Sequence, residues 1–320
     1  MQAEGRLVLQ SSAPGRIRQD RNAQRAFSVI TLLPVLLIVI VAIALVVRAW
    51  PITRAASVWD TLLGVVWKPE DGLFGFWPFI TGTVWVTVVG VALSVPPCLL
   101  IAFYLSEYAH RATRSVAKPV LDLLAAIPPV VYGVWGLLAI VPFVQDLVAP
   151  LAKRWFSGIS VLHVHQPTGF SILTGGIVLA VMIAPLIISV VYEILAAVPN
   201  DLRHASLAVG ATRWQTIRNV VLPQVLTGIV AAIVLAASRA LGETIAVLMV
   251  VGNVAKVPTS IFDAAYPLPA LIANNYGDMM SIPLYDAALL GAALVLLFVI
   301  LIFNVISTLV LQRMLRRKWA

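Results

Sequence analysis

The chain has 320 residues, of which 61% are hydrophobic and only 11% are charged, and its mean hydropathy is +0.98. A soluble protein of this length needs more charge to solvate its surface, so the composition argues against soluble enzymes and nucleic-acid-binding proteins. It indicates an integral membrane protein. The single cysteine, Cys98, excludes an intrachain disulfide and a cysteine-based metal cluster.

Six apolar stretches are each long enough for about 20 helical residues across a bilayer. The first follows a polar tail, residues 1–26, and is too long for the core of a signal peptide, so we expect it to be retained. The six stretches lie near residues 27–47, 80–105, 123–144, 170–192, 225–248 and 287–311. Internal prolines, including Pro128 and Pro129, indicate kinked helices in a bundle. We therefore predict an all-α membrane protein with six transmembrane helices over residues 27–312 and a basic tail over 313–320.

The basic residues predict the orientation of these spans. Five lie in the N-terminal tail, three in each of the second and fourth loops and four in the C-terminal tail, which makes fifteen. The first, third and fifth loops carry six, and Arg239 lies inside a span. The positive-inside rule then places both termini and the even loops in the cytoplasm. Most of the formal net charge of +8 reflects this topology.

The sequence has no Gly-rich phosphate loop of the form GxxxxGK[ST], so ATP would have to be bound by another subunit. His163 and His165 lie two residues apart in the third loop, and the sequence places no carboxylate or thiol cluster near them. We expect an ordinary polar loop there. The chain is thus expected to hold no metal and no cofactor, and not to be an enzyme by itself.

The fourth loop, residues 193–223, has a distinct pattern. Apolar residues recur at near-helical spacing on both sides of Gly210, namely Leu202, Leu207 and Ala208 before it and Trp214, Ile217 and Val221 after it. This pattern predicts two short amphipathic helices around a glycine turn. Their apolar face needs a cover, which periodicity alone leaves open between the membrane surface, neighbouring spans and a partner protein.

This loop resembles the cytoplasmic loop of ABC importer permeases, whose pattern is Glu-Ala-Ala, three residues, Gly, nine residues, Ile, any residue, Leu-Pro. The spacing is kept from Ala205 through Gly210 to Leu222 and Pro223, with His204 in place of the Glu. Ser206 and Val220 are the other departures. The resemblance implies coupling to the ATPase through Arg203, His204, Ala205, Gly210, Ala211, Thr212, Trp214, Leu222 and Pro223.

Three further stretches narrow the family. They are AAIPPVVYGVWG over residues 125–136, YLSEY over 104–108, and SRALGETIAV over 238–247, which is followed by Gly252-Asn253. From about Phe74 to the end of the sixth span, the chain resembles the membrane subunits of the phosphate-specific ABC importer, and the YGVWG stretch favours the C-type subunit.

That resemblance implies a type I importer bundle in the bacterial cytoplasmic (inner) membrane. The implied partners are the lipid bilayer, a second, A-type permease, two ATP-binding subunits that carry ATP and Mg, and an extracytoplasmic phosphate-binding protein. No nucleic acid is expected. The implied activity is ATP-driven import of inorganic phosphate.

Arg239 and Glu243 lie four residues apart in an otherwise apolar span, so we expect them on one helical face. Either charge at mid-membrane costs roughly 2.5 to 3.5 kcal/mol unless it is paired or hydrated. One reading is a structural ion pair that locks helices together. The other is a substrate pathway, in which the forked guanidinium assists a tetrahedral oxyanion and the carboxylate prevents tight retention. The resemblance favours the pathway.

Three alternatives remain open at this stage. Another oxyanion, such as molybdate or sulfate, would suit the same arginine. An ion-coupled secondary carrier could use Arg239 and Glu243 without an ATPase, although the fourth-loop pattern argues against it. The third alternative is a membrane signalling or assembly subunit.

Overall fold

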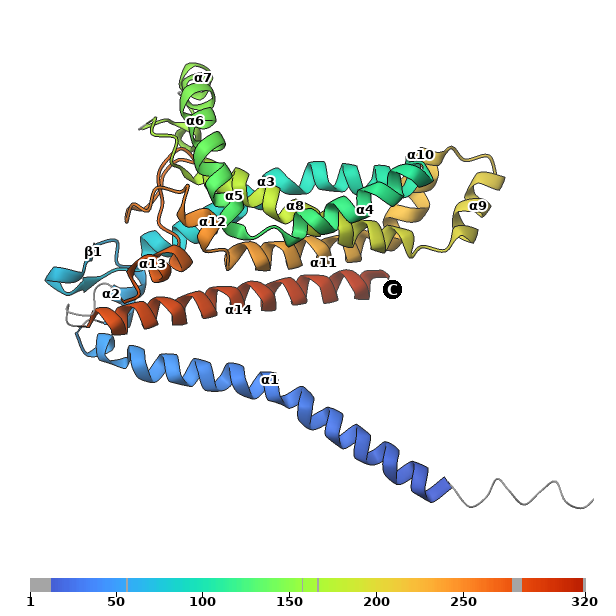
Figure 1. Ribbon diagram of the computed structural model, residues 1–320, viewed down its shortest axis with the longest axis horizontal. Coiled ribbons are helices and arrows are strands. Elements are labelled where there is room, and N and C mark those ends of the chain that lie inside the picture. The colour runs from blue at the N-terminus through green and yellow to red at the C-terminus, as the bar shows by residue number, and fades with distance from the viewer. Residues whose placement is uncertain (1–12, 56, 157, 166, 278–283, 319–320) are drawn as a thin grey trace, which may run out of the picture.

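The computed structural model describes residues 13–55, 57–156, 158–165, 167–277 and 284–318 (Figure 1). Within these ranges six helices are long and apolar enough to cross a membrane, as the sequence predicts. Five of these crossing segments lie in or include α1 (Ala13–Ala55), α3 (Trp77–Phe103), α8 (Ile172–Ala196), α11 (Leu222–Leu241) and α14 (Tyr285–Lys318). Helix α4 (Arg111–Ala126) is long but is not one of the six. The shorter ones are α2 (Val58–Leu63), α5 (Pro129–Trp135), α6 (Val141–Phe143), α7 (Ala149–Trp155), α9 (Asn200–Ala208), α10 (Arg213–Thr216), α12 (Ile245–Leu248) and α13 (Leu268–Asn275).

Helices α3 and α8 form the centre of the bundle and pack against each other more extensively than any other pair, with α11 and α4 against α8. Glycines make this close approach possible. A Cβ atom at Gly90 would lie 2.9 Å from Leu179, and one at Gly176 would lie 2.5 Å from Val89. Membrane helices pack through such small residues because lipid supplies no hydrophobic force between helices.

A small structure closes the end of the bundle opposite α9. The strands β1 (Trp67–Lys68) and β2 (Leu73–Phe74) pair in antiparallel fashion. The Trp67 ring meets the ring of Phe79 edge-on, with 5.0 Å between their centroids. The hydroxyl oxygen of Thr83 in α3 accepts the backbone N–H of Leu268 at 2.9 Å, which ties α13 to α3.

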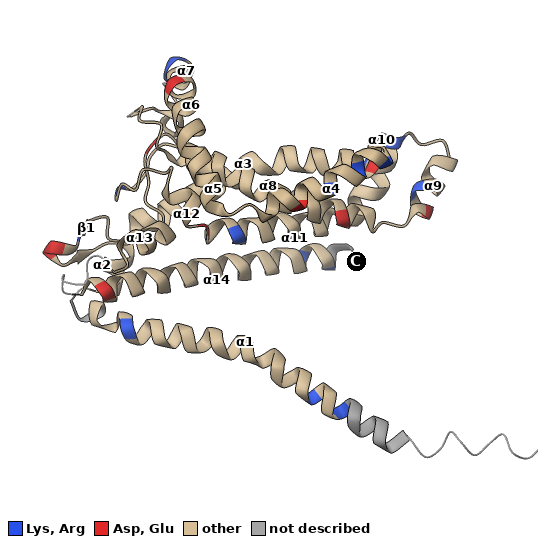
Figure 2. Ribbon diagram, in the orientation of Figure 1, with Lys and Arg blue, Asp and Glu red and all other residues tan. Residues whose placement is uncertain are grey.

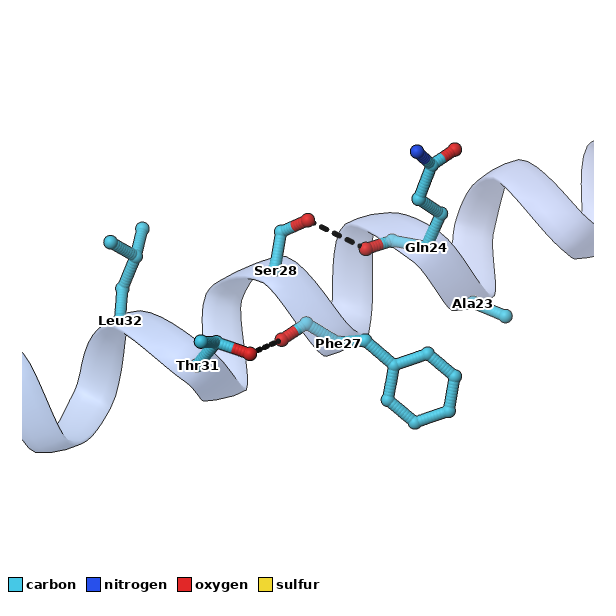
Figure 3. Close-up of a pocket in the computed structure, with 6 residues that line it drawn as sticks. All are labelled: Ala23, Gln24, Phe27, Ser28, Thr31 and Leu32. Carbon is cyan, nitrogen blue, oxygen red and sulfur yellow. Dashed lines mark hydrogen bonds between the residues drawn. The ribbon is translucent and has the colours of Figure 1, made fainter. Parts of the chain in front are cut away.

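Helix α1 lies at the edge of the bundle and packs mainly against α14, while its N-terminal half diverges from the other helices (Figure 1). Figure 3 shows a hollow along this half, where the hydroxyls of Ser28 and Thr31 donate to the carbonyl oxygens of Gln24 and Phe27. Both hydroxyls are thus used within the helix. Large apolar side chains are exposed along α1, as expected for a lipid-facing span.

Two predicted spans have the wrong bounds. The stretch 123–144 is not one helix, because α4 ends at Ala126 and a new helix begins at Pro129. Ile127 and Pro128 each precede a proline and are therefore extended rather than helical. The third membrane-crossing segment is Pro129–Trp155, and it contains π-helical turns at Gly136–Ile140 and Val144–Val148.

The predicted fifth span, 225–248, is also wrong. Its helix α11 begins at Leu222 and ends at Leu241, and α12 begins only at Ile245. Helices α1 and α14 extend beyond their predicted spans at both ends, whereas the bounds of α3 and α8 lie within a few residues of the predicted ones. The fourth loop is correspondingly shorter than 193–223, because α8 continues to Ala196.

Different elements lie at the two ends of the bundle. The start of α1, the pair α9 and α10, and the end of α14 lie toward one end, whereas β1, α7 and α13 lie toward the other (Figure 1). Figure 2 shows long uncharged stretches along α1 and α14. This arrangement places the start of α1, the end of α14 and the fourth loop on one side, and the basic residues predict that this side is cytoplasmic.

Single cysteines test this orientation. In a Cys98→Ala background, cysteine in place of exposed Ser115, at the α9 end, should react with an impermeant thiol reagent only after the membrane is opened. Cysteine in place of exposed Glu70, in the turn between β1 and β2, should react in intact cells. The measurement is labelling before and after permeabilisation, and reversed labelling would overturn the orientation.

Candidate functional site

The fourth loop forms a helix pair around a glycine, which confirms the prediction. Helix α9 ends at Ala208, Gly210 follows with φ +88°, and α10 begins after Thr212. Thr212 and Gln215 form a reciprocal capping box that fixes the start of α10. A 2.9 Å hydrogen bond between the hydroxyls of Ser206 and Thr216 joins the two helices.

Gly210 is required by backbone conformation rather than by space. A Cβ atom at this position would have no other atom within 4 Å, so lack of space is not the constraint. The left-handed φ is instead the constraint, since a β-branched side chain is strongly disfavoured in that region.

Arg203 joins α9 to two membrane helices. Its Nη2 and Nε donate to the two carboxylate oxygens of Glu107 at 3.0 and 3.3 Å, and Glu107 lies in the π-helical turn that continues α3. The guanidinium also donates to the carbonyl oxygens of Leu195 (2.8 Å) and Val198 (2.5 Å), at the end of α8. The side chains of Arg203 and Glu107 are only 15% and 11% exposed. Such bidentate, charge-assisted contacts hold the three segments together.

The remaining residues predicted for coupling are placed differently. His204 and Ala205 are exposed on α9, and Ala211 and Thr212 form the turn. Leu222 and Pro223 begin α11, which continues directly from the π-helical turn Ile217–Val221. The structure therefore brings the turn and the helix pair together, while Arg203 points toward the bundle.

The tip of this loop exposes apolar side chains, which we call the loop-4 surface. Val209 is 85% exposed, Trp214 is 62% exposed, and Leu202 and Leu207 are each 40% exposed. The spans of this chain therefore do not cover the surface, which removes one of the alternatives left open by periodicity. The sequence pattern identified Leu202, Leu207 and Trp214, but it gave Val209 no role.

A cavity of about 460 Å³, which we call the basic cavity, lies beside the loop-4 surface. Its wall includes four arginines and two histidines, namely Arg111, Arg114, Arg203, Arg213, His110 and His204. The one carboxylate in that wall, Glu107, already accepts two hydrogen bonds from Arg203.

Arg239 and Glu243 do not share a helical face, which corrects the sequence-based expectation. Helix α11 ends at Leu241, and Gly242 turns the chain before α12 begins. Among the described residues, no ion pair joins Arg239 to Glu243. Glu243 instead accepts the backbone N–H of Ala246 at 3.3 Å, at the start of α12.

Arg239 is exposed on the surface of this single chain, close enough to Tyr132 of α5 to act on it electrostatically. Tyr132 in turn donates its hydroxyl to the carbonyl oxygen of Leu124 at 2.8 Å, which joins α5 to α4. A structural ion pair between Arg239 and Glu243 is therefore not what holds these helices together.

At the opposite end, the Nδ1 atom of His165 lies 2.8 Å from a carboxylate oxygen of Asp263. The sequence gave no carboxylate near His165, because Asp263 is far along the chain. Burial raises the pKa of Asp263, but hydrogen bonds from Thr259, His165 and Ser260 outweigh it and hold the pKa below its ordinary value. The pair therefore contributes stability at neutral pH that is lost as the pH falls.

Within the described ranges, no three His, Cys, Asp or Glu residues are grouped to hold a metal ion.

Comparison with known protein families identifies the family of this chain. Residues 98–318 match the family described as "Binding-protein-dependent transport system inner membrane component". This match covers more than half of the chain, including α9, α10 and α11, so the chain belongs to that family of ABC importer permeases.

Several relatives are similar over most of their length. The phosphate transport system permease protein PstC of Mesorhizobium japonicum is 32% identical over 96% of this chain and 95% of its own. PstC of Xylella fastidiosa (strain Temecula1) is 34% identical over 79% of this chain and 78% of its own. The probable ABC transporter permease protein YqgH of Bacillus subtilis is 37% identical over 76% of each chain.

Solved structures share the fold. A chain of a bacterial ABC transporter that imports the acidic polysaccharide alginate aligns with a TM-score of 0.59 at 16% identity, over 93% of this chain and 99% of that one. A chain of the MetNI methionine ABC transporter in an inward-facing conformation aligns with a TM-score of 0.50 at 20% identity, over 75% and 94%. The type I importer bundle is thus the fold of this chain, in a multi-pass inner-membrane protein.

The Arg203–Glu107 contact makes a measurable prediction. Arg203→Leu should lower the free energy of unfolding by about 3 kcal/mol, because it leaves a nearly buried carboxylate without its partner. Replacing both Arg203 and Glu107 with leucine should recover part of the lost free energy of unfolding. The matched control is Lys118→Leu, since the Lys118–Glu193 pair is 61% and 64% exposed and should matter little. The measurement is thermal unfolding in detergent, and equal effects of Arg203→Leu and Lys118→Leu would contradict the prediction.

Proposed function

We propose that this chain is the C-type permease subunit of an ATP-driven importer that moves inorganic phosphate into the cytoplasm. The observation that carries the proposal is the similarity to phosphate transport permeases along nearly the whole chain, at 32% identity over 96% of it. Its partners would be an A-type permease, two ATPase subunits that bind ATP and Mg, and an extracytoplasmic phosphate-binding protein.

The loop-4 surface would dock on an ATPase subunit. Exposed Val209 and Trp214 supply apolar area, and the turn at Gly210 presents them away from the bundle. Movement of α9 would reach the central helices through Arg203, which bonds to the ends of both α3 and α8. Arg203 is then a positioning residue that links docking to the transmembrane helices.

Arg239 would assist the anion along the pathway, and Glu243 would tune its release. Arg239 is exposed on this chain, so a second permease facing α11 would enclose it between two subunits. An enclosed guanidinium has forked donors that suit a tetrahedral oxyanion. The carboxylate of Glu243, which is not paired with Arg239, would oppose tight binding of the anion.

One arginine does not choose among oxyanions, so molybdate or sulfate is the alternative substrate. The relatives named for phosphate favour phosphate. An ion-coupled carrier or a signalling subunit is less well supported, because neither explains the exposed loop-4 surface. Uptake of labelled phosphate by the reconstituted complex, with sulfate and molybdate as competitors, tests the assignment directly.

Gly210→Val tests coupling. We expect phosphate uptake to fall at least tenfold and less ATPase to co-purify, because a β-branched residue cannot hold the left-handed turn. The abundance of the subunit in the membrane should stay normal. The control is Gly158→Val, where the added side chain meets open space without a left-handed φ. Unchanged uptake by Gly210→Val would remove this loop from the mechanism.

Arg239→Gln tests the pathway. We expect an assembled complex whose phosphate uptake is reduced at least tenfold, because the anion loses its charged donor. Arg239→Lys should keep partial activity, since it retains the charge without the planar fork. Arg48→Gln, at an exposed position of α1, is the matched control. Wild-type uptake by a complex with leucine at both Arg239 and Glu243 would rule out the pathway role.

A further inference from the structure

The basic cavity has more positive charge than the described part of the chain neutralises. Four ion pairs occur among the described residues, and none of them includes Arg111, Arg114 or Arg213. Arg114 donates one N–H to the carbonyl oxygen of Ser106, and its Nε atom is buried without a hydrogen-bond partner. Neighbouring like charges destabilise one another unless an anion lies between them. The cavity is therefore built to receive negative charge.

The surroundings of the cavity indicate that this charge comes from a protein. Leu207 is part of the cavity wall, and Trp214 and Val209 are exposed on the neighbouring turn. A free inorganic anion gains nothing from apolar neighbours. Apolar side chains beside charged groups are instead the pattern of a protein interface.

The sequence points in the same direction. His204, which stands where the importer pattern has Glu, belongs to the cavity wall. This substitution removes a negative charge from the exposed side of α9. Arg111 and Arg213 also lie in this wall. With histidine at position 204, the wall contains no unpaired carboxylate.

We propose that the basic cavity receives carboxylate side chains, aspartate or glutamate, from the surface of the ATPase subunit that docks on loop 4. The proposal rests on the proposed function and adds the chemistry of the partner: an acidic patch that Arg111 and Arg213 recognise. It also assigns Arg111, in the second loop, to an interface that the sequence pattern confines to the fourth.

The test is retention of the ATPase by the affinity-purified importer complex over a series of salt concentrations. Wild-type retention should weaken with salt, since exposed charge pairs are screened. Arg213→Glu and Arg111→Glu should each reduce retention at least tenfold at low salt, and His204→Glu should reduce it as well. Arg218→Glu makes the same change of charge at an exposed residue outside the cavity wall and should change retention less than twofold.

Three results would overturn the proposal. An equal loss with Arg218→Glu would mean that only net charge matters. Unchanged retention with Arg213→Glu would exclude carboxylate recognition by the cavity. Binding of labelled inorganic phosphate that Arg213→Glu abolishes, with ATPase retention intact, would make the cavity a small-anion site. A wild-type subunit that retains no ATPase at all would instead refute the proposed function.

Discussion

The contact between Arg203 and Glu107 is the constraint on which the arrangement of this chain depends. One guanidinium satisfies a carboxylate at the end of α3 and two terminal carbonyl groups at the end of α8, while its own backbone belongs to α9. The two helices that form the centre of the bundle are therefore both tied to α9. In the proposed importer, a force on α9 would act on both helices together.

The charges of the bundle also bear on the proposed assembly. Arg239 lies in a helix that crosses the membrane, and a charged side chain there is costly unless it is hydrated or enclosed in protein. In this chain it faces outward, as do the apolar residues of the loop-4 surface. Two different surfaces, one polar within the membrane and one apolar outside it, fit the two kinds of partner in the proposed importer.

Local patterns predicted the six spans and the helix pair around Gly210, because hydrophobic length and helical spacing are properties of neighbouring residues. They did not predict where helices break. Ile127 and Pro128 were expected within a kinked helix, yet successive prolines made them extended. The break after Leu241 separated Arg239 from Glu243. Glu107 belongs to the YLSEY stretch, but nothing in the sequence pairs it with Arg203, because their contact depends on how α3 and α8 pack.

The position of α1 bears on how the protein is made. Of the described spans this helix is synthesised first, yet it packs mainly against α14, the last of them. Contacts between the two ends of a chain form only after everything between them has been inserted. During synthesis α1 must therefore stay in the bilayer with lipid as its only neighbour along that face, and its uniformly apolar surface suits it to that wait. The seam between α1 and α14 would therefore close only after α14 has been inserted.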